Sequence, residues 1–365
     1  MSQSSDESRR VQTLRGIACI LLVAFHTIGS QAISGMKVDD DSGYRFFANL
    51  FLYLRMPLFT FLSGFVYAYR PVLPGGIGEF ARRKFIRLVL PLLCVSTLYF
   101  AATRLAPDNA VWQLPLDQMW RIYVFPYVHY WFLQAILVIF AVVALLDRFQ
   151  LLSTPGRYAV AFAAFVTLHL TTPMTYQDEV PFSALDAIYL APYFLLGLGA
   201  NRFRKILMQP LVSWTCVVVV LVSMLMHAAM LLQGQTPPHD GAPLELLVGI
   251  TGALALIALC PGFKPLEQIG AYSFAIYLFH PFFVGAARAV TKPVGVTGVL
   301  FTVCLIAGVF GPMVLERVLG NVPVVKTLLF GRRSRTRPAA EPARVTLAGQ
   351  VAGHAGEVSS SSSSG

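Results

Sequence analysis

Long apolar stretches alternate with short polar connections along almost the whole chain. They lie at about 13–33, 46–69, 88–105, 130–147, 158–173, 184–200, 211–233, 245–261, 269–290 and 295–319. A helix needs about 17–25 apolar residues to cross a bilayer, and all but one of these stretches fall in that range. The pattern therefore predicts an all-α, polytopic integral membrane bundle of about ten transmembrane helices. The shortest stretch, 158–173, also suits a buried or tilted helix.

The composition agrees with a membrane protein. Hydrophobic residues make up 56% of the 365 residues and charged residues only 13%, and the mean hydropathy is +0.65, which excludes an ordinary soluble domain. The net charge of +10 does not indicate a nucleic-acid partner, because the basic residues lie in the connections between spans. All five cysteines fall inside apolar stretches without a CxxC spacing, so we expect neither a disulfide framework nor a metal site.

The basic residues are distributed unequally between alternate connections. One set of connections holds most of the 28 Lys and Arg. The other set holds Lys37, Arg45, Arg104, Arg121, Arg288 and Lys292. The positive-inside rule then places both termini in the cytoplasm. The first apolar stretch also resembles a cleavable signal peptide, but an arginine and a histidine inside it are abnormal for a passive export signal.

Two segments differ in composition from the spans. Residues 1–322 are expected to form the membrane domain, and 323–365 a basic and then Ser-rich disordered cytoplasmic tail. The basic part of that tail either anchors the topology or rests on anionic membrane lipids. The connection 106–129 contains Trp112, Trp120 and two tyrosines, which suit the outer membrane interface.

The first apolar stretch, LRGIACILLVAFH from Leu14 to His26, carries two ionisable residues. Arg15 and His26 are eleven positions apart, which on an α-helix means three turns plus about 20° and an axial separation of about 16 Å. The two side chains therefore share a helix face, with Arg15 near the cytoplasmic boundary and His26 deep in the membrane. Ionisable groups inside a span indicate a functional site. The alternative is an arginine that reaches the interface and a core histidine bonded to a neighbouring helix.

Two further ionisable residues are expected at the depth of His26. Arg55 lies near the middle of the second span and His280 near the middle of the ninth, each about 16 Å from the inner boundary on helical rise. We therefore expect His26, Arg55 and His280 to line one polar cavity that opens outward as well as inward. The alternative for Arg55 is an internal ion pair with Asp186. His169 falls near the same depth without a motif around it, and we expect a core histidine there.

Four cations follow the second span, in the segment FARRKFIRLVLPLL. They are Arg82, Arg83, Lys84 and Arg87, with Arg83 and Arg87 at i and i+4. Arginine binds phosphate groups bidentately, so this cluster predicts a binding site for a phosphorylated cytoplasmic donor. A purely topological role is the alternative.

Several of these segments resemble the acyltransferase-3 family of bacterial membrane acyltransferases. The similar segments are LRGIACILLVAFH, RMPLFTFLSGF, RRKFIRLVLP, YWFL, APYFLLG and GAYSFAIYLFHP, in order across about 10–285. The resemblance implies a multi-pass protein of the bacterial inner membrane that takes an acyl group, acetyl above all, from cytoplasmic acyl-CoA. The acceptor it implies is a hydroxyl of a surface glycan or a lipid-linked saccharide. The chain resembles the stand-alone members that act on exopolysaccharide or lipopolysaccharide.

Carried over by position, the resemblance makes His26 the essential histidine and Arg15 its signature partner. Arg83 and Arg87 match the basic residues that follow the second helix. The residues themselves suit acyl transfer, with His26 as general base or as a nucleophile that carries the acyl group, and Arg55 as stabiliser of the oxyanion. Ser63 lacks a GxSxG setting, which disfavours a serine-hydrolase mechanism.

Three other protein classes share some of these features. A transporter also places Arg and His inside the membrane, although the internal repeats that are typical of transporters are not evident here. A signalling receptor is disfavoured because the tail contains no folded domain. The unrelated membrane-bound O-acyltransferases place a catalytic histidine in a late helix, which here would be His280.

Overall fold

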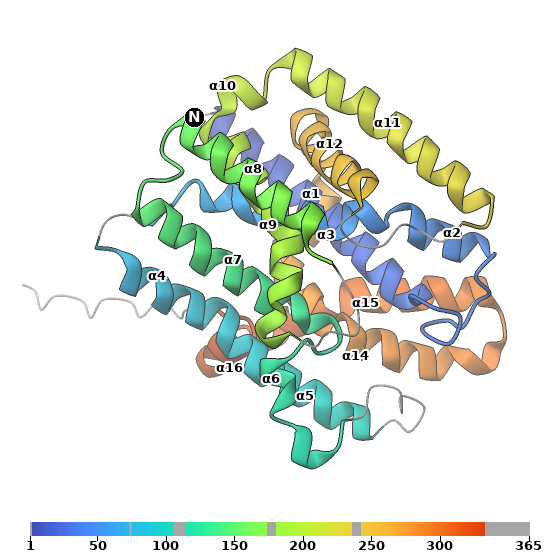
Figure 1. Cartoon of the computed structure of the whole chain (residues 1–365). Helices are drawn as coiled ribbons and strands as arrows, with labels where there is room; N and C mark the ends of the chain where they lie inside the picture. Colours follow the sequence, from blue (N-terminus) through green and yellow to red (C-terminus); the bar gives the residue numbers. More distant parts are fainter. Residues whose placement is uncertain (1, 73–74, 106–113, 174–179, 236–241, 333–365) are drawn as a thin grey trace, which may run out of the picture. The chain divides into compact units, whose positions relative to one another are not determined.

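The computed structural model of the chain describes residues 2–72, 75–105, 114–173, 180–235 and 242–332, which form an all-α bundle (Figure 1). The main helices are α1 (Ser2–Ile28), α2 (Gly43–Leu50), α3 (Leu52–Tyr67), α4 (Ile77–Lys84), α5 (Leu90–Arg104), α7 (Trp131–Arg148), α8 (Pro155–Thr171), α9 (Ala184–Arg202), α11 (Pro210–Leu232), α12 (Pro243–Leu259), α13 (Lys264–Ala271), α14 (Ser273–Thr291) and α15 (Thr297–Leu319). Shorter helical elements are η1 (Phe85–Val89), η3 (Leu116–Gln118), α6 (Arg121–Val124), η4 (Val128–Tyr130), η5 (Pro181–Ser183), α10 (Arg204–Leu207), η6 (Lys292–Val294) and α16 (Pro323–Leu328).

Every apolar stretch of the sequence corresponds to helix in the structure. Eight segments within the described ranges are long and apolar enough to cross a membrane. The stretches 158–173 and 245–261 form α8 and α12, which have 17 residues each. Figure 1 shows α14 beside α15 and α11 beside α12, as expected for consecutive helices joined by short connections. The chain is thus a polytopic helical bundle.

Two of the expected continuous helices are interrupted. The stretch 46–69 is divided at Phe51 into α2 and α3, and 269–290 is divided at Tyr272 into α13 and α14. Tyr272 has a non-helical backbone (φ −102°, ψ 12°), which allows α13 to pack along α1 while α14 takes a separate course. A continuous apolar pattern does not reveal such breaks, because apolar residues continue through both points.

Glycines allow the central helices to cross closely. A Cβ on Gly64 of α3 would lie 1.9 Å from the carbonyl oxygen of Phe194, and one on Gly197 of α9 would lie 1.9 Å from that of Phe61. Small residues at helix contacts permit such backbone approach in membrane proteins. The α3–α9 crossing therefore depends on glycine on both sides, and it fixes the helix that carries Arg55.

The connection after α5 is more deeply packed than a surface loop. Within its described part, Ile122 is fully buried and Tyr127 is 5% exposed. Gln134 of α7 donates from Nε2 to the carbonyls of Tyr123 and Phe125, at 3.1 Å each. The end of this connection is therefore packed into the bundle, while Trp120 is 53% exposed. Its place at the outer membrane interface stays a prediction, and Trp112 lies outside the described residues.

The packed body continues past the predicted domain boundary at 322. Helix α16 follows directly, and the next residues pack through Phe330, which is 1% exposed. Arg332 forms an ion pair with Glu316 of α15 at 2.9 Å and donates to the carbonyl of Ala271. The prediction of a disordered tail from 323 is therefore wrong up to Arg332, because a buried apolar side chain and a half-exposed ion pair hold this segment. Residues 333–365 lie outside the described part.

Candidate active site

Three histidine rings from distant parts of the sequence lie together inside the bundle. His26 is near the end of α1, His129 is in η4, and His280 is in α14. The ring centroids are 5.0 Å apart for His26 and His280, 5.1 Å for His129 and His280, and 6.0 Å for His26 and His129. His129 and His280 are buried and His26 is half-buried. We call these three residues the histidine cluster.

The end of α1 is fixed just beyond His26. Gly29 has a φ of +94°, which favours glycine and ends the helix at Ile28. The buried guanidinium of Arg45 donates to the carbonyl of Gly29 and forms an ion pair with Asp40 at 3.2 Å. This arrangement sets the position of the last turn of α1, and so of the His26 ring.

A proline orients the ring of His280. Pro281 lacks an N–H, which leaves the carbonyl of Tyr277 without its usual helical donor. Nδ1 of His280 lies 2.9 Å from this carbonyl and 2.9 Å from that of Ile276. Nδ1 must therefore carry the hydrogen, and in the neutral ring Nε2 keeps its lone pair. Nε2 is buried and has no hydrogen-bond partner among the described residues.

Two arginines approach His26. The guanidinium carbon of Arg55 lies 3.5 Å from the centre of the Phe25 ring, and Arg55 interacts electrostatically with both His26 and His280. Arg55 is only 8% exposed, so its charge faces the protein rather than lipid. Arg288 of α14 donates to the backbone carbonyl of His26 at 3.5 Å and interacts electrostatically with its ring. The surroundings of His26 are therefore cationic.

A cavity of about 430 Å³ lies at the end of the bundle that carries the basic cluster. Five cationic side chains line it, namely Arg15, Arg70, Arg83, Lys84 and Arg87. The remaining lining residues are mostly aromatic or aliphatic and none is acidic. We call this space the basic cavity. Cations gathered around an apolar hollow form a binding site for a ligand that is part anion and part hydrocarbon.

A π-helical turn carries Arg87 into this cavity. The turn η1 lies between α4 and α5, and the N–H of Leu90 donates to the carbonyl of Phe85. Pro91 has no N–H to offer to the carbonyl of Arg87, which favours this irregular turn. The Arg87 guanidinium lies 4.4 Å from the centre of the Phe274 ring and donates to the carbonyl of Phe330 at 3.2 Å. Arg87 is thus held in place by α14 and by the C-terminal segment.

Arg82 differs from its neighbours in the basic cluster. It is exposed and forms an ion pair with Glu79 at 2.8 Å, one turn earlier on α4. It is not among the residues that line the basic cavity. The sequence therefore grouped four cations of which the structure brings three, Arg83, Lys84 and Arg87, to the cavity. Arg70, at the end of α3, was not predicted and joins them.

Aromatic side chains that line the basic cavity reach the histidine cluster through Tyr277. Phe59, Phe132 and Tyr277 line the cavity, and we call them the aromatic floor. The rings of Phe132 and Tyr277 are 5.6 Å apart, and those of Tyr277 and His129 are also 5.6 Å apart. On α1, Arg15 reaches the cavity while His26 belongs to the cluster, so one helix connects the two sites.

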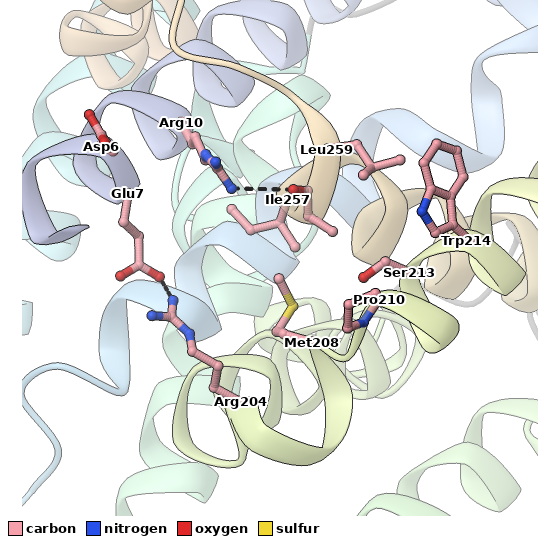
Figure 2. A pocket seen from close by; sticks show the side chains of 11 residues that line it. Asp6, Glu7, Arg10, Arg204, Met208, Pro210, Ser213, Trp214, Ile257 and Leu259 are labelled. Atoms are coloured by element: carbon pink, nitrogen blue, oxygen red, sulfur yellow. Dashed lines mark hydrogen bonds and ion pairs between the residues drawn. The ribbon is translucent and has the colours of Figure 1, made fainter.

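A second cavity, of about 480 Å³, lies between α1, α11 and α12 (Figure 2). Three of its four charged side chains are engaged, since Arg204 forms an ion pair with Glu7 and Arg10 donates to the carbonyl of Ala258 at 3.2 Å. None of the predicted site residues lines it. Of the predicted site residues, Arg15, Arg83, Lys84 and Arg87 line the basic cavity, whereas His26, Arg55 and His280 line neither of these two cavities.

The chain matches the model of the acyltransferase-3 family, an acyltransferase domain, over residues 9–317. The chain belongs to the acyltransferase-3 family. It is therefore a multi-pass membrane protein of a family of acyltransferases, which favours an enzyme over a transporter. No curated protein and no solved structure matches the chain.

Within this acyltransferase-3 protein, sequence reasoning missed three residues near the site. His129 directly precedes the YWFL segment, and a histidine beside an apolar span was the available signal. Arg288 was counted only as a charge of an outer connection, and Arg70 only as one of an inner connection. His169, in contrast, is fully buried and bonded to the carbonyl of Tyr189, as expected of a core residue. In the described part of the chain, no group of His, Cys, Asp or Glu side chains is arranged to hold a metal ion.

Proposed function

We propose that this protein is an O-acyltransferase of the bacterial cytoplasmic membrane that uses acyl-CoA as its donor. The acyl group, acetyl in the simplest case, goes to a hydroxyl of a surface glycan, such as exopolysaccharide or lipopolysaccharide, or of a lipid-linked saccharide. Both termini lie in the cytoplasm in this proposal, so the basic cavity faces the cytoplasmic donor. The acceptor reaches the histidine cluster from the opposite side.

The continuity of α1 between the basic cavity and the histidine cluster supports this proposal most directly. Arg15 lines the cavity and His26 lies in the cluster, about 16 Å further along the helix axis. Coenzyme A has its phosphates at one end and its thioester at the end of a long apolar arm. The five cations would hold the phosphates, and the arm would extend past the aromatic floor toward His26.

The chemistry requires one base and one site for a developing negative charge. In one form of the reaction, His26 removes the proton of the acceptor hydroxyl as the oxygen attacks the thioester carbonyl. In the other form, His26 attacks the thioester itself and carries the acyl group to the hydroxyl. In both forms a C–S bond breaks, a C–O bond forms, and Arg55 stabilises the oxyanion. His280, the late-helix histidine, belongs to the same cluster, so both histidine hypotheses concern a single site.

The first test is the release of free thiol from acetyl-CoA by the purified protein in liposomes, with water or membrane glycan as the acceptor. We expect His26→Ala to abolish release while expression and the unfolding midpoint stay close to wild type. Full activity of His26→Ala would contradict the assignment. A protein that no longer folds would instead indicate a structural histidine.

The second test compares two adjacent arginines. Arg83→Gln should raise the donor KM about tenfold, which corresponds to loss of one charge-assisted hydrogen bond. The increase should grow at high salt, where the remaining charges are screened. Arg82→Gln removes the same charge outside the cavity and should change KM much less. Equal effects of the two substitutions would show that net charge, rather than the cavity, governs donor binding.

A further inference from the structure

His129 occupies an unusual position in the fold. It belongs to a one-turn element between α6 and α7 rather than to a long helix. Its ring is 5% exposed and lies against both other histidines of the cluster. His227 offers a comparison, because it too is buried, but its ring packs on Tyr53 and bonds to the carbonyl of Asn49. Burial alone therefore does not explain why three histidines meet at one place.

The backbone before His129 is strained. Val128 has a φ of +40°, which is a genuine outlier for a β-branched residue. Such strain persists only where the surrounding structure enforces it, and it is frequent at functional sites. Here Tyr277 donates its hydroxyl hydrogen to the carbonyl of His129, and Tyr130 donates to that of Leu278 at 3.2 Å. These two bonds tie η4 to α14, the helix of His280.

The orientation of the His129 ring leaves one nitrogen available. The ring interacts with the carbonyl of Leu278, and Nε2 is buried without a partner among the described residues. The interaction with Leu278 therefore uses Nδ1, so that Nε2 of the neutral ring is an acceptor. His280 has the same arrangement, with Nδ1 on backbone carbonyls and Nε2 available. Two acceptor nitrogens thus lie beside His26.

The ring of His129 is also in contact with the donor side. Its ring lies 5.6 Å from that of Tyr277, and Tyr277 forms part of the aromatic floor of the basic cavity. His129 itself does not line that cavity. Its ring therefore contacts both a residue of the cavity lining and the half-buried ring of His26.

We propose that His129 is a proton-transfer residue of the acyl-transfer reaction. This inference rests on the proposed function, in which the hydroxyl and the thioester approach from opposite sides. The hydroxyl loses its proton to His26, and the sulfur of coenzyme A leaves as a thiolate that needs a proton. His129 takes the proton from His26 and delivers it toward that thiolate, so that the O–H proton ends as S–H and no other reactant is consumed. Ring separations of 5–6 Å allow transfer between ring nitrogens directly or through one water.

The test uses the full chain in liposomes with acetyl-CoA as donor and water as acceptor. Thiol release is measured for wild type, His129→Gln and the matched control His227→Gln. Glutamine keeps a hydrogen-bonding side chain but cannot shuttle a proton. We expect kcat of His129→Gln to fall about 100-fold, as for loss of a general acid–base group, with the donor KM within about twofold of wild type. The control should keep its kcat.

Two further readouts separate proton transfer from a structural role. The solvent deuterium isotope effect on kcat should rise in His129→Gln, because proton transfer becomes the slow step. Imidazole in the buffer should restore part of the rate of His129→Gly, since it can occupy the vacated space. The unfolding midpoint is measured for each variant. If His129→Gln does not fold, His129→Asn is used in its place.

Three results would overturn the inference. The first is full kcat in His129→Gln or His129→Asn. The second is a lowered kcat with an unchanged isotope effect and no rescue by imidazole, which would make His129 a packing residue. The third is a wild-type protein that releases no thiol from acetyl-CoA or from longer acyl-CoA donors, which would overturn the proposed function itself. The wild-type protein lacks activity only in the third case. Failure of this inference can therefore be distinguished from failure of the proposed function.

Discussion

Pro281 acts on the site through the backbone hydrogen that it lacks. The carbonyl of Tyr277, which would accept from residue 281 in a regular helix, instead accepts from Nδ1 of His280 at 2.9 Å. In Pro281→Ala a backbone N–H returns and competes for this carbonyl. We expect kcat to fall about fivefold, the equivalent of about 1 kcal/mol for one hydrogen bond, while stability is unchanged or higher.

The control for this substitution is Pro312→Ala in α15. Pro312 also lies inside a helix, but no histidine follows or precedes it. Thiol release and the unfolding midpoint are measured for both variants. A similar kcat for Pro281→Ala and wild type would mean that the Ile276 carbonyl alone is enough to hold the ring.

Several residues of the candidate site can be predicted from the sequence. Helical rise places His26 and His280 at similar depth, and their rings do lie 5.0 Å apart. His129 escapes this reasoning because its place depends on the backbone of Val128, and the left-handed conformation of a valine is not foreseeable from local sequence. The difference between Arg82 and Arg83 is likewise invisible in a run of cations, since it depends on which side of α4 meets α3 and α7.

At the scale of helices, the α3–α9 contact is the most sensitive to added volume. In Gly64→Ala the new methyl group would lie 1.9 Å from the carbonyl oxygen of Phe194, so the two helices must separate. We expect a loss of about 1–3 kcal/mol in the free energy of unfolding, as for other overpacked cores. Unfolding in detergent would measure the change.

Gly285→Ala is the matched control for the crossing. Gly285 is also helical, in α14, but a Cβ there meets no atom within 4 Å. The substitution should leave stability equal or slightly higher, because alanine favours helix over glycine. If Gly64→Ala were as stable as Gly285→Ala, the close α3–α9 contact described above would be incorrect.

The apolar pattern predicts where helices lie better than where they end. Length and hydropathy identify the same ten stretches that are helical in the structure. The breaks at Phe51 and Tyr272 escape prediction because apolar residues continue through both points and no proline or glycine stands at either. The packing of residues 122–129 was also not predicted, because it depends on Gln134 donating to the carbonyls of Tyr123 and Phe125.

At the scale of the whole molecule, the end of the packed body can be tested by truncation. A chain that ends at Arg332 keeps Phe330 and the Arg332–Glu316 ion pair, and should retain wild-type stability and donor KM. A chain that ends at Val322 loses both, together with the carbonyl that accepts from Arg87. We expect a loss of about 1.5–3 kcal/mol in the free energy of unfolding from the lost burial of Phe330 alone, and a raised donor KM.

Unfolding midpoints and thiol-release kinetics of the two truncated chains would decide this prediction. Equal unfolding midpoints and equal donor KM for the two chains would favour the domain boundary at 322 that composition alone predicts. That boundary followed from the polar, Ser-rich end of the chain, which dominates the average over 323–365. Composition cannot detect that one aromatic residue and one arginine at the start of such a segment have partners elsewhere in the fold.

The aromatic floor has a consequence for the energetics of the cell. An enzyme that takes one substrate from each side of a membrane must not let ions leak down the gradients that the membrane maintains. Phe59, Phe132 and Tyr277 line the basic cavity with packed rings, and the ring of Tyr277 contacts that of His129 in the histidine cluster. In the proposed function, packed rings on the route to the cluster would exclude ions that keep their hydration shells, whereas a slender thioester arm would pass. Catalysis across the bilayer is then compatible with electrical insulation, and only single protons bound to imidazole would pass between the two sides.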